Sequence, residues 1–543
     1  DAAVADDPLA ALDAALEQAE RDLLELGAVM AERVGPEEAE IMASHAVIAR
    51  DPELRALAAE GVAAGRSPSE AVTAAFDTFI ALLADVGGEV FGERTADLTD
   101  VRDRVVDLLE GRSTAVVLPD GPVVLVAPEL LPSHTAAFPP ELLLGVVTET
   151  GSPTSHASIL ARAMGIPAVV GCGGATTTVA GGEPMAIDGG TGEVLVAPSE
   201  ADLERLRGAA ARLAEREVSL RALRDRAGAT ADGVRIELSA NIGSPDDLAV
   251  AIEVGAEGAG LVRTELLFEG RRTAPAVDEQ AELYRRILAA FPGHRVVFRT
   301  MDIGADKPLP FVRRGREENP SLGLRGLRLH LAERELLRTQ LAAVLRAADG
   351  ASGGGAGSGR PAVMFPMVAA PSELDEALGE LGGVVAAEGA DGAGLEVGVM
   401  VEVPSAALDA ARLASRVSFL SVGTNDLVQY VFAADRLNHA VSATGEAADP
   451  VVLRLIASVA AQGEANGAWT GVCGEAAGDP GLALVLVGLG VRELSMSARS
   501  IPAVKDALRR FTLDECRDLA ALATAPDAGT AELRRHLDGL LPA

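Results

Sequence analysis

One histidine lies where a Gly/Pro-rich loop leads into an amphipathic segment, in the stretch GSPTSHASILARAMGIPAVVG at 151–171. The pattern predicts that His156 occupies the first turn of a helix, with Thr154 and Ser155 as N-cap candidates. A phosphoryl group on this imidazole would lie near free backbone N–H groups and the positive end of the helix dipole. His156 is therefore a candidate anion carrier, although a structural histidine near a helix cap would give the same pattern. The other six histidines, His45, His134, His294, His330, His439 and His536, are expected to be structural.

Between 234 and 497 there are eight short apolar segments, and polar residues that could form a site follow six of them. In chain order these residues are Asn241, Arg263, Arg299 with Asp302, Glu402, Asn425 with Asp426, and Cys473 with Glu475; the loops add Lys307, Arg325 and Arg436. If the segments are parallel strands of one barrel, their carboxyl ends share one mouth. These side chains are then expected to converge.

Several guanidinium groups at one mouth, together with a few carboxylates, predict a compact and multiply charged anionic ligand. Bidentate contacts of arginine suit both carboxylate and phosphate oxygens, so the ligand is expected to carry both. Glu402 and Asp426 would supply the one or two carboxylates by which Mg²⁺ is usually held. Each residue taken alone is equally well explained as a surface arginine or a salt-bridge partner, and only the combination favours a site.

The chain contains two lysines, Lys307 and Lys505, and every other basic residue apart from histidine is arginine. Lys307 lies beside the predicted anion site, where a compact ammonium differs from a planar guanidinium. Lys505 has no such neighbourhood, and its retention is attributed to chance. Cys473 is more simply a buried inert thiol, but at a strand end beside Glu475 it is also placed to donate a proton.

The elements that must position these residues fall into blocks with different periodicities. Apolar residues at helical spacing run from 8 to about 110, with a capping-box start at SPSE, 67–70. Short β-rich runs separated by Gly and Pro turns follow at about 114–198, and a charged helical stretch occupies 199–228. From 234 onward, strand and helix patterns alternate eight times, which predicts a (β/α)₈ barrel.

The predicted fold is therefore a multidomain α/β protein. Its parts are a helical bundle at 1–112, an α/β domain at 113–198, a linker helix at 199–232 and the barrel at 233–543. The glycine-rich stretch at 348–361 is expected to be a flexible surface loop.

Composition excludes several classes of protein. A formal net charge of −33 argues against a nucleic-acid partner, because phosphate contacts require clustered Lys and Arg. Three widely spaced cysteines suggest neither disulfides nor a zinc site, and a reducing cytoplasm fits them. No apolar run reaches the roughly 18 residues needed to cross a bilayer, and the first ten residues do not read as a signal peptide.

Several separated motifs resemble one known family along essentially the whole chain. GSPTSHASILAR is similar to the phosphohistidine signature of enzyme I of the bacterial phosphoenolpyruvate:sugar phosphotransferase system. The phosphoenolpyruvate-binding barrel of that family is resembled, in family order, by GLVRTELLF, VVFRTMDIGADK, VGVMVEVPSA, LSVGTNDLVQY, ADR and WTGVCGEAAGD. The match of so many separated motifs makes the resemblance specific.

The resemblance implies a role for each matching residue. His156 is implied as the phosphorylated histidine, attacked through Nε2, and Cys473 as the acid that protonates enolpyruvate. Glu402 and Asp426 are implied as ligands of the cofactor Mg²⁺. The phosphoenolpyruvate contacts implied are Arg263, Arg299, Asn425, Asp426 and Arg436, with Lys307 and Arg325 as further contacts.

The resemblance also implies partners. The helical region would dock the carrier protein HPr, which receives the phosphoryl group on a histidine, and His45 would be a docking residue at most. The barrel is expected to form a homodimer in the cytoplasm, and the hinge that swings the phosphohistidine domain is expected in 199–228. Members of the family begin with a strand containing a Ser-Pro-Gly turn, so the α/β domain of this chain is expected to lack that strand.

Two other readings are open from the sequence. Pyruvate phosphate dikinase and phosphoenolpyruvate synthase share the histidine and barrel motifs, but the first 110 residues contain no lysine and no Gly-rich phosphate loop for ATP. A regulatory paralogue that binds phosphoenolpyruvate or HPr without turnover is the third reading. Against it, every expected catalytic position is filled.

Overall fold

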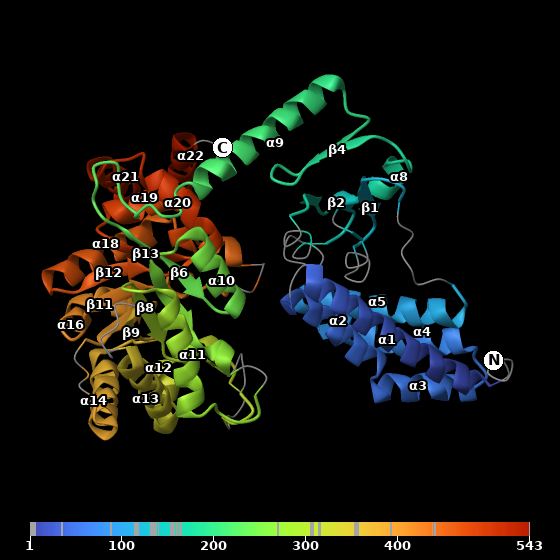
Figure 1. The fold of residues 1–543 in the computed structure, drawn as a ribbon, viewed down its shortest axis with the longest axis horizontal. Helices are drawn as coiled ribbons and strands as arrows, with labels where there is room; N and C mark the ends of the chain where they lie inside the picture. The colour runs from blue at the N-terminus through green and yellow to red at the C-terminus, as the bar shows by residue number, and fades with distance from the viewer. Residues whose placement is uncertain are drawn as a thin grey trace. The chain divides into compact units, whose positions relative to one another are not determined.

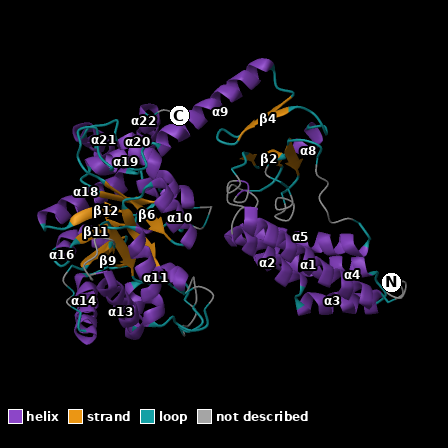
Figure 2. Ribbon diagram, in the orientation of Figure 1, coloured by secondary structure: helices purple, strands orange, loops and turns teal. Residues whose placement is uncertain are grey.

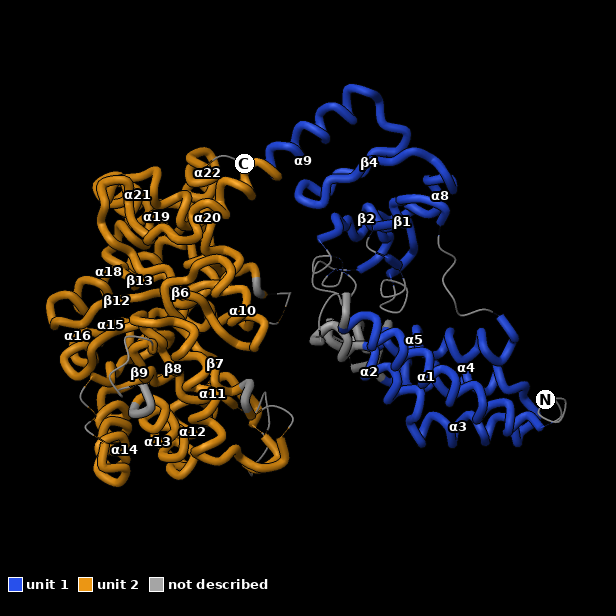
Figure 3. Tube along the Cα trace, viewed as in Figure 1, with its two compact units in different colours: residues 1–213 blue, residues 214–543 orange. Residues whose placement is uncertain are grey.

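The protein folds into two compact units, residues 1–213 and 214–543, which are described separately here (Figure 3). A computed structural model describes residues 7–33, 36–86, 89–112, 119–130, 138–139, 141–151, 158, 161, 165–268, 271–304, 309–312, 317–351, 358–390, 392, 394–436, 438 and 441–541.

The first unit begins with five helices, as the apolar spacing predicts (Figure 1). They are α1 (Pro8–Arg33), α2 (Pro36–Ala49), α3 (Pro52–Ala63), α4 (Pro68–Val86) and α5 (Glu89–Leu109). Their common core includes the buried residues Leu12, Leu23 and Phe76. The predicted capping box at the start of α4 is present, since Ser67 Oγ accepts from the N–H of Glu70 while the Glu70 carboxylate accepts from the N–H of Ser67.

His45 of α2 is completely buried in this bundle, as expected of a structural histidine. Its Nε2 lies 3.0 Å from Asp97 Oδ1 and its Nδ1 lies 3.5 Å from Asp100 Oδ2, both on α5. Burial disfavours the charged imidazole, but the hydrogen bonds and charges of Asp100 and Asp97 outweigh it and raise the pKa of His45 to about 9. A protonated histidine therefore joins two helices from inside the bundle.

The rest of the first unit contains two small sheets. Parallel strands β1 (Val123–Ala127), β2 (Leu143–Thr148) and β3 (Ala168–Val169) form one, and antiparallel β4 (Met185–Asp188) and β5 (Glu193–Val196) form the other. The short helix α8 (Ala175–Thr178) lies between them in the chain. Strand β4 was not predicted, because its four residues follow a Gly-Gly turn and give no clear alternation. His156 lies outside the described residues.

The linker prediction corresponds to a single helix, α9 (Glu200–Arg221), in which no residue is buried. The boundary between the two compact units falls inside this helix, after Leu213. Just beyond the helix, the carbonyls of Leu223 and Arg224 accept hydrogen bonds of 3.3 and 3.1 Å from Lys505 Nζ. A third bond of 3.3 Å goes to Gly255, so a buried ammonium holds three backbone carbonyls. Attributing Lys505 to chance was wrong, because a compact ammonium suits this arrangement better than a planar guanidinium.

The second unit is the predicted barrel (Figure 2). Its eight strands are β6 (Glu237–Ile242), β7 (Gly258–Arg263), β8 (Arg295–Arg299), β9 (Arg360–Phe365), β10 (Glu396–Val401), β11 (Phe419–Val422), β12 (Trp469–Val472) and β13 (Glu493–Met496). All pair in parallel with their sequence neighbours, and β13 pairs with β6 to close the ring. The eight-strand prediction is therefore confirmed.

Helices surround the strands. They are α10 (Pro245–Val254), α11 (Val277–Ala290), α12 (Leu327–Ala332), α13 (Arg334–Ala351), α14 (Pro371–Glu388), α15 (Pro404–Leu408), α16 (Ala410–Ala414), α17 (Thr424–Phe432), α18 (Pro450–Ala465), α19 (Pro480–Gly488), α20 (Ile501–Leu508), α21 (Leu513–Thr524) and α22 (Thr530–Leu540). In the described parts of the chain, none of the helices is long and apolar enough to cross a membrane.

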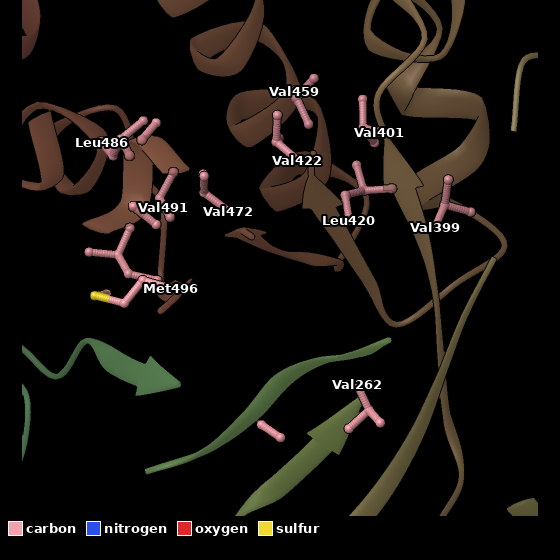
Figure 4. Close-up of a cluster of buried hydrophobic side chains, with 14 of the residues drawn as sticks. Val262, Val399, Val401, Leu420, Val422, Val459, Val472, Leu486, Val491 and Met496 are labelled. Atoms are coloured by element: carbon pink, nitrogen blue, oxygen red, sulfur yellow. The ribbon is translucent and has the colours of Figure 1, made fainter. Parts of the chain in front are cut away.

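Side chains alternate between the two faces of each barrel strand and so contribute to two separate cores. On β10 and β11, Val399, Val401, Leu420 and Val422 belong to the large core between strands and helices (Figure 4). Their neighbours Met400 and Phe419 belong to a smaller cluster together with Leu261 and Val297 of β7 and β8, which fills the inside of the ring. A barrel of this kind is filled by side chains, so a ligand has room only at an end.

We predict that His45→Gln destabilises the helical bundle by about 3 kcal/mol, because it leaves two buried carboxylates without their cation. Since the folded pKa of about 9 lies above the value of about 6.5 for an unperturbed histidine, protonated His45 stabilises the fold fully below pH 6.5. That contribution is lost as the pH rises through 9. Hydrogen exchange of peptides from α2 and α5 should therefore be faster in the variant at pH 6, with the difference shrinking towards pH 10.

The matched control is His536→Gln, which changes an exposed histidine on α22. It should leave exchange in α2 and α5 unchanged at every pH. Equal protection of these helices in wild type and His45→Gln at pH 6 would contradict the role assigned to the buried histidine.

Candidate functional site

The carboxyl ends of the barrel strands enclose a polar cavity of about 250 Å³. It contains the predicted site residues Arg263, Arg299, Arg325, Glu402, Asn425, Asp426, Arg436 and Cys473, whereas Asn241 lines the adjoining cavity. These residues come from five strand ends and two loops, and closure of the ring brings them together. Lys307, like His156, lies outside the described residues.

Arg299 ends β8 and is buried, with 7% of its surface exposed. Its guanidinium forms an ion pair with Glu265 and another of 3.3 Å with Asp302. Burial opposes the charge, but Glu265 and Asp302 outweigh it, and the pKa of Arg299 is raised above its ordinary value. This guanidinium is fixed in place before any ligand arrives.

Arg325 reaches the same carboxylate from the loop before α12. Its Nη2 and Nε lie 2.9 and 3.3 Å from the two Asp302 oxygens, a bidentate pair. Burial would raise the pKa of Asp302, but Arg299 and Arg325 together lower it. The next residue, Gly326, has φ of 54°, and a Cβ there would come within 3.1 Å of Asp302 Oδ1. Glycine at this position lets the backbone approach the buried carboxylate closely.

The other two arginines are more exposed. Arg263, at the end of β7, forms no ion pair with any residue that the structure describes, and its side chain reaches solvent. Arg436 is 47% exposed in its side chain and lies 4.0 Å from Asp426 Oδ1. Two cationic side chains at the rim are therefore available to an incoming anion, in contrast to the fixed pair in the interior.

Glu402 follows β10 and is 1% exposed. Its Oε1 accepts a 2.6 Å hydrogen bond from the N–H of Met367, a non-glycine residue held at φ of 58°. Such a backbone conformation is costly for a side-chain-bearing residue and is retained where the surroundings impose it. Burial and the neighbouring charges of Asp302 and Asp426 raise the pKa of Glu402 well above its ordinary value.

These carboxylates fit a hard divalent cation. Asp426 Oδ1 is buried and accepts no hydrogen bond from the described residues, and the cavity holds five carboxyl groups against four guanidiniums. A Cβ on Gly423 would crowd Glu402 Oε2 at 3.1 Å, so glycine keeps space beside that oxygen. Among the described residues no group of three or more His, Cys, Asp or Glu could hold a metal. Two carboxylates suit Mg²⁺ when ligand oxygens and water fill the remaining positions.

Cys473 closes the floor of the cavity and is 4% exposed. Burial raises the pKa of its thiol to about 12, so the thiol is protonated at neutral pH. Its Sγ lies 3.7 Å from the carbonyl of Val422. A Cβ on the next residue, Gly474, would clash with Thr424, so glycine allows the turn after β12 to pack against the start of α17.

Asn425 and Glu475 join the ends of β11 and β12. Asn425 Nδ2 donates to Glu475 Oε1 at 3.2 Å, and Asn425 Oδ1 accepts from the Glu475 N–H at 3.1 Å. This reciprocal pair fixes the amide beside Asp426. A second cavity of about 470 Å³ adjoins the first and shares Arg263, Asn425, Cys473 and Glu475 with it. The thiol can therefore be approached from two sides of the barrel mouth.

Sequence reasoning missed two residues that shape this cavity. Glu265 holds Arg299, but it follows the strand end by two residues in a 3₁₀ turn, Thr264–Leu267, where no period identifies an inward side chain. Met367 donates a hydrogen bond to Glu402 through its backbone N–H, and its backbone has a positive φ. Neither feature depends on the Met367 side chain, so the sequence gives no sign of it. The one local signal for Glu265 is that an acidic residue directly follows Arg263 and Thr264 at the end of β7.

Three family descriptions match successive parts of the chain. The PEP-utilising enzyme N-terminal region matches residues 2–94, the PEP-utilising enzyme mobile domain matches 119–192, and the PEP-utilising enzyme PEP-binding domain matches 217–513. The last of these alone covers more than half of the chain and contains all the cavity residues named above.

Characterised relatives match nearly end to end. A protein of Streptomyces coelicolor is 46% identical over 91% of this chain and 86% of its own length, and one of Haloferax volcanii is 44% identical over 90% and 85%. A third, from Listeria innocua, is 38% identical over 94% and 88%. All three are named phosphoenolpyruvate-protein phosphotransferase. With this extent of identity and all three domains in order, the chain belongs to the phosphoenolpyruvate-protein phosphotransferase family.

Proposed function

We propose that this protein transfers the phosphoryl group of phosphoenolpyruvate to Nε2 of its own His156 and then to a histidine of an HPr-type carrier, releasing pyruvate. The observation that carries the proposal is the single cavity in which four guanidiniums, two candidate metal ligands and a protonated thiol meet. Phosphoenolpyruvate carries a carboxylate, a phosphate and a carbon that must be protonated. Each of these has a chemically matched partner in the cavity.

The arginines provide binding and charge neutralisation. Arg299 and Arg325 are held by Asp302 and form a fixed cationic wall, while Arg263 and Arg436 at the rim are free to close on the ligand. The amide of Asn425 is oriented by Glu475 and donates a further hydrogen bond. Catalysis of phosphoryl transfer depends mainly on such positioning and on offsetting charge at the transferred group.

Glu402 and Asp426 are the residues proposed to hold Mg²⁺. An ion bound there would supply positive charge beside the phosphate oxygens. The cavity alone does not supply a net positive charge, because its four guanidiniums are opposed by five carboxyl groups. The Met367 N–H binds Oε1 of Glu402, so Oε2 is the oxygen that would remain for the ion.

The groups proposed above account for both the phosphoryl transfer and the proton transfer. The bond from phosphorus to the enol oxygen breaks while a bond forms to Nε2 of His156. The enolate of pyruvate then takes a proton on its methylene carbon from the Cys473 thiol, and the thiolate recovers a proton from water. The role of His156 rests on the resemblance of its segment, since that segment lies outside the described residues.

The proposal extends to the partners of the protein and to its cellular compartment. The helical bundle would receive the carrier, the barrel would join two copies in a homodimer, and the protein would act in the cytoplasm. Three free cysteines within the described residues and the charge of −33 fit a reducing compartment and a basic protein partner. The homodimer follows from the resemblance alone.

Labelled phosphoenolpyruvate tests the central proposal directly. Incubation of the wild type with Mg²⁺ should give one acid-labile, histidine-linked phosphoryl group per chain, and His156→Ala should abolish it. His536→Ala, which removes an exposed histidine, is the matched control and should label fully. An unlabelled wild type, or full labelling of His156→Ala, would sink the proposal.

The metal assignment predicts that Glu402→Gln raises the Mg²⁺ concentration needed for half-maximal labelling by at least about tenfold, because one anionic ligand is lost. Glu376→Gln, on the exposed surface of α14, should leave the Mg²⁺ dependence unchanged. If both variants titrate like the wild type, Glu402 is not a ligand of the ion.

The acid role of Cys473 predicts slow alkylation. With a pKa of about 12, only about one thiol in ten thousand is ionised at pH 8. Iodoacetamide followed by peptide mass spectrometry should therefore modify the partly exposed Cys172 well before Cys473 or the buried Cys516. The unfolded chain should label at all three sites. Rapid labelling of folded Cys473 would show a thiolate, which has no proton to donate.

A further inference from the structure

A buried network behind the cavity contains a glutamine that no catalytic role explains. Gln340 lies on α13, outside the barrel strands, and is 2% exposed. Its Oε1 accepts a 2.9 Å hydrogen bond from the N–H of Met301. Its Nε2 donates to Thr264 Oγ1 at 2.7 Å and to Tyr284 at 3.2 Å. All three contacts lie behind the ends of β7 and β8.

The orientation of this amide is fixed by its partners. A backbone N–H can only donate, so the side-chain oxygen of Gln340 must face Met301 and the nitrogen must face Thr264. The Thr264 hydroxyl, which accepts from Gln340, then donates to the carbonyl of Arg299 at 2.7 Å. Each link in the chain therefore has a single direction.

The network begins where the sheet hydrogen bonds end. Arg263 and Arg299 form the last pair in the register between β7 and β8. Beyond them, Thr264 and Gln340 provide the connection between the two strand ends. Through its bond to Thr264, Gln340 is linked to the residue after Arg263 and to the carbonyl of Arg299. Through its bond to Met301, it holds the residue before Asp302, whose carboxylate is shared by two buried arginines.

We propose that Gln340 is a positioning residue for the anion site, holding the ends of β7 and β8 so that their guanidiniums face one ligand. It does not line the cavity, so it acts through Thr264 and Met301 and not on the substrate. This inference rests on the proposed function of the cavity. A buried polar network in which every group is satisfied favours one arrangement of its backbone over others.

The chain offers a closely matched control. Gln462 on α18, which is partly buried, accepts a 2.9 Å bond from the N–H of Ala411 and donates a 2.7 Å bond to Ser458, so it repeats the backbone contact and one hydroxyl contact of Gln340. The Ala411 bond joins α16 to α18, and Ser458 lies on α18 itself, so neither contact involves a strand end. Replacing either glutamine by methionine removes the same kinds of hydrogen bond at similar volume, but only one of them supports the cavity.

The test is single-turnover phosphorylation of the full chain at varied concentrations of labelled phosphoenolpyruvate. Gln340→Met should raise the half-saturating concentration by about 10- to 100-fold, because small displacements of positioning groups are costly. Gln462→Met should leave that concentration within about twofold of wild type, even if both variants melt at a lower temperature. Equal half-saturation in the two variants would overturn the proposal.

Two further variants separate positioning from general damage. Thr264→Val removes the same link from its other end, so the double variant with Gln340→Met should be no worse than the more affected single variant. If the effects of Thr264→Val and Gln340→Met add fully, the two residues do not act through one network. If the wild type itself fails to label, the proposed function is refuted. That outcome differs from one in which the wild type labels but the two glutamine variants saturate equally.

Discussion

The carboxylate of Asp302 lies between two buried guanidiniums, and the anion cavity depends on this arrangement. Arg299 and Arg325 would repel each other strongly in a low-dielectric interior, and neither could be buried without a partner. Asp302 contacts both, at 3.3 and 2.9 Å, while Glu265 contacts Arg299 from another side. The cationic wall is therefore built before a ligand binds, and its charge is largely balanced.

The support for these charges comes from outside the cavity. Helix α13 contributes Gln340 to the ends of β7 and β8, and the loop after β9 contributes the Met367 N–H to Glu402. In both cases a neutral hydrogen-bonding group, itself buried, fixes a backbone or a carboxylate that faces the ligand. The helices of the barrel thus serve the site as well as the core, and changes on their inner faces are expected to reach the ligand.

Much of the molecule could be predicted from local pattern. The five N-terminal helices follow the spacing of their apolar residues, and the eight strands follow from short apolar runs, most of which end on a polar residue. Strand β4 escaped because four residues after a Gly-Gly turn carry too little alternation. The partners of His45 could not be predicted, because a histidine within a helical pattern looks the same whether it faces solvent or, as here, two aspartates of α5.

The sequence alone determined the fold class, the family resemblance and the set of side chains at the barrel mouth, because strand ends and motifs are local features. Only the tertiary structure decided which of those side chains are already paired, such as Arg299, and which form no ion pair with the described residues, such as Arg263. It also decided that Lys505 holds three carbonyls and that Gln340 stands behind the site. Pairing and burial join residues that are tens to hundreds of positions apart, and no local pattern records those distances.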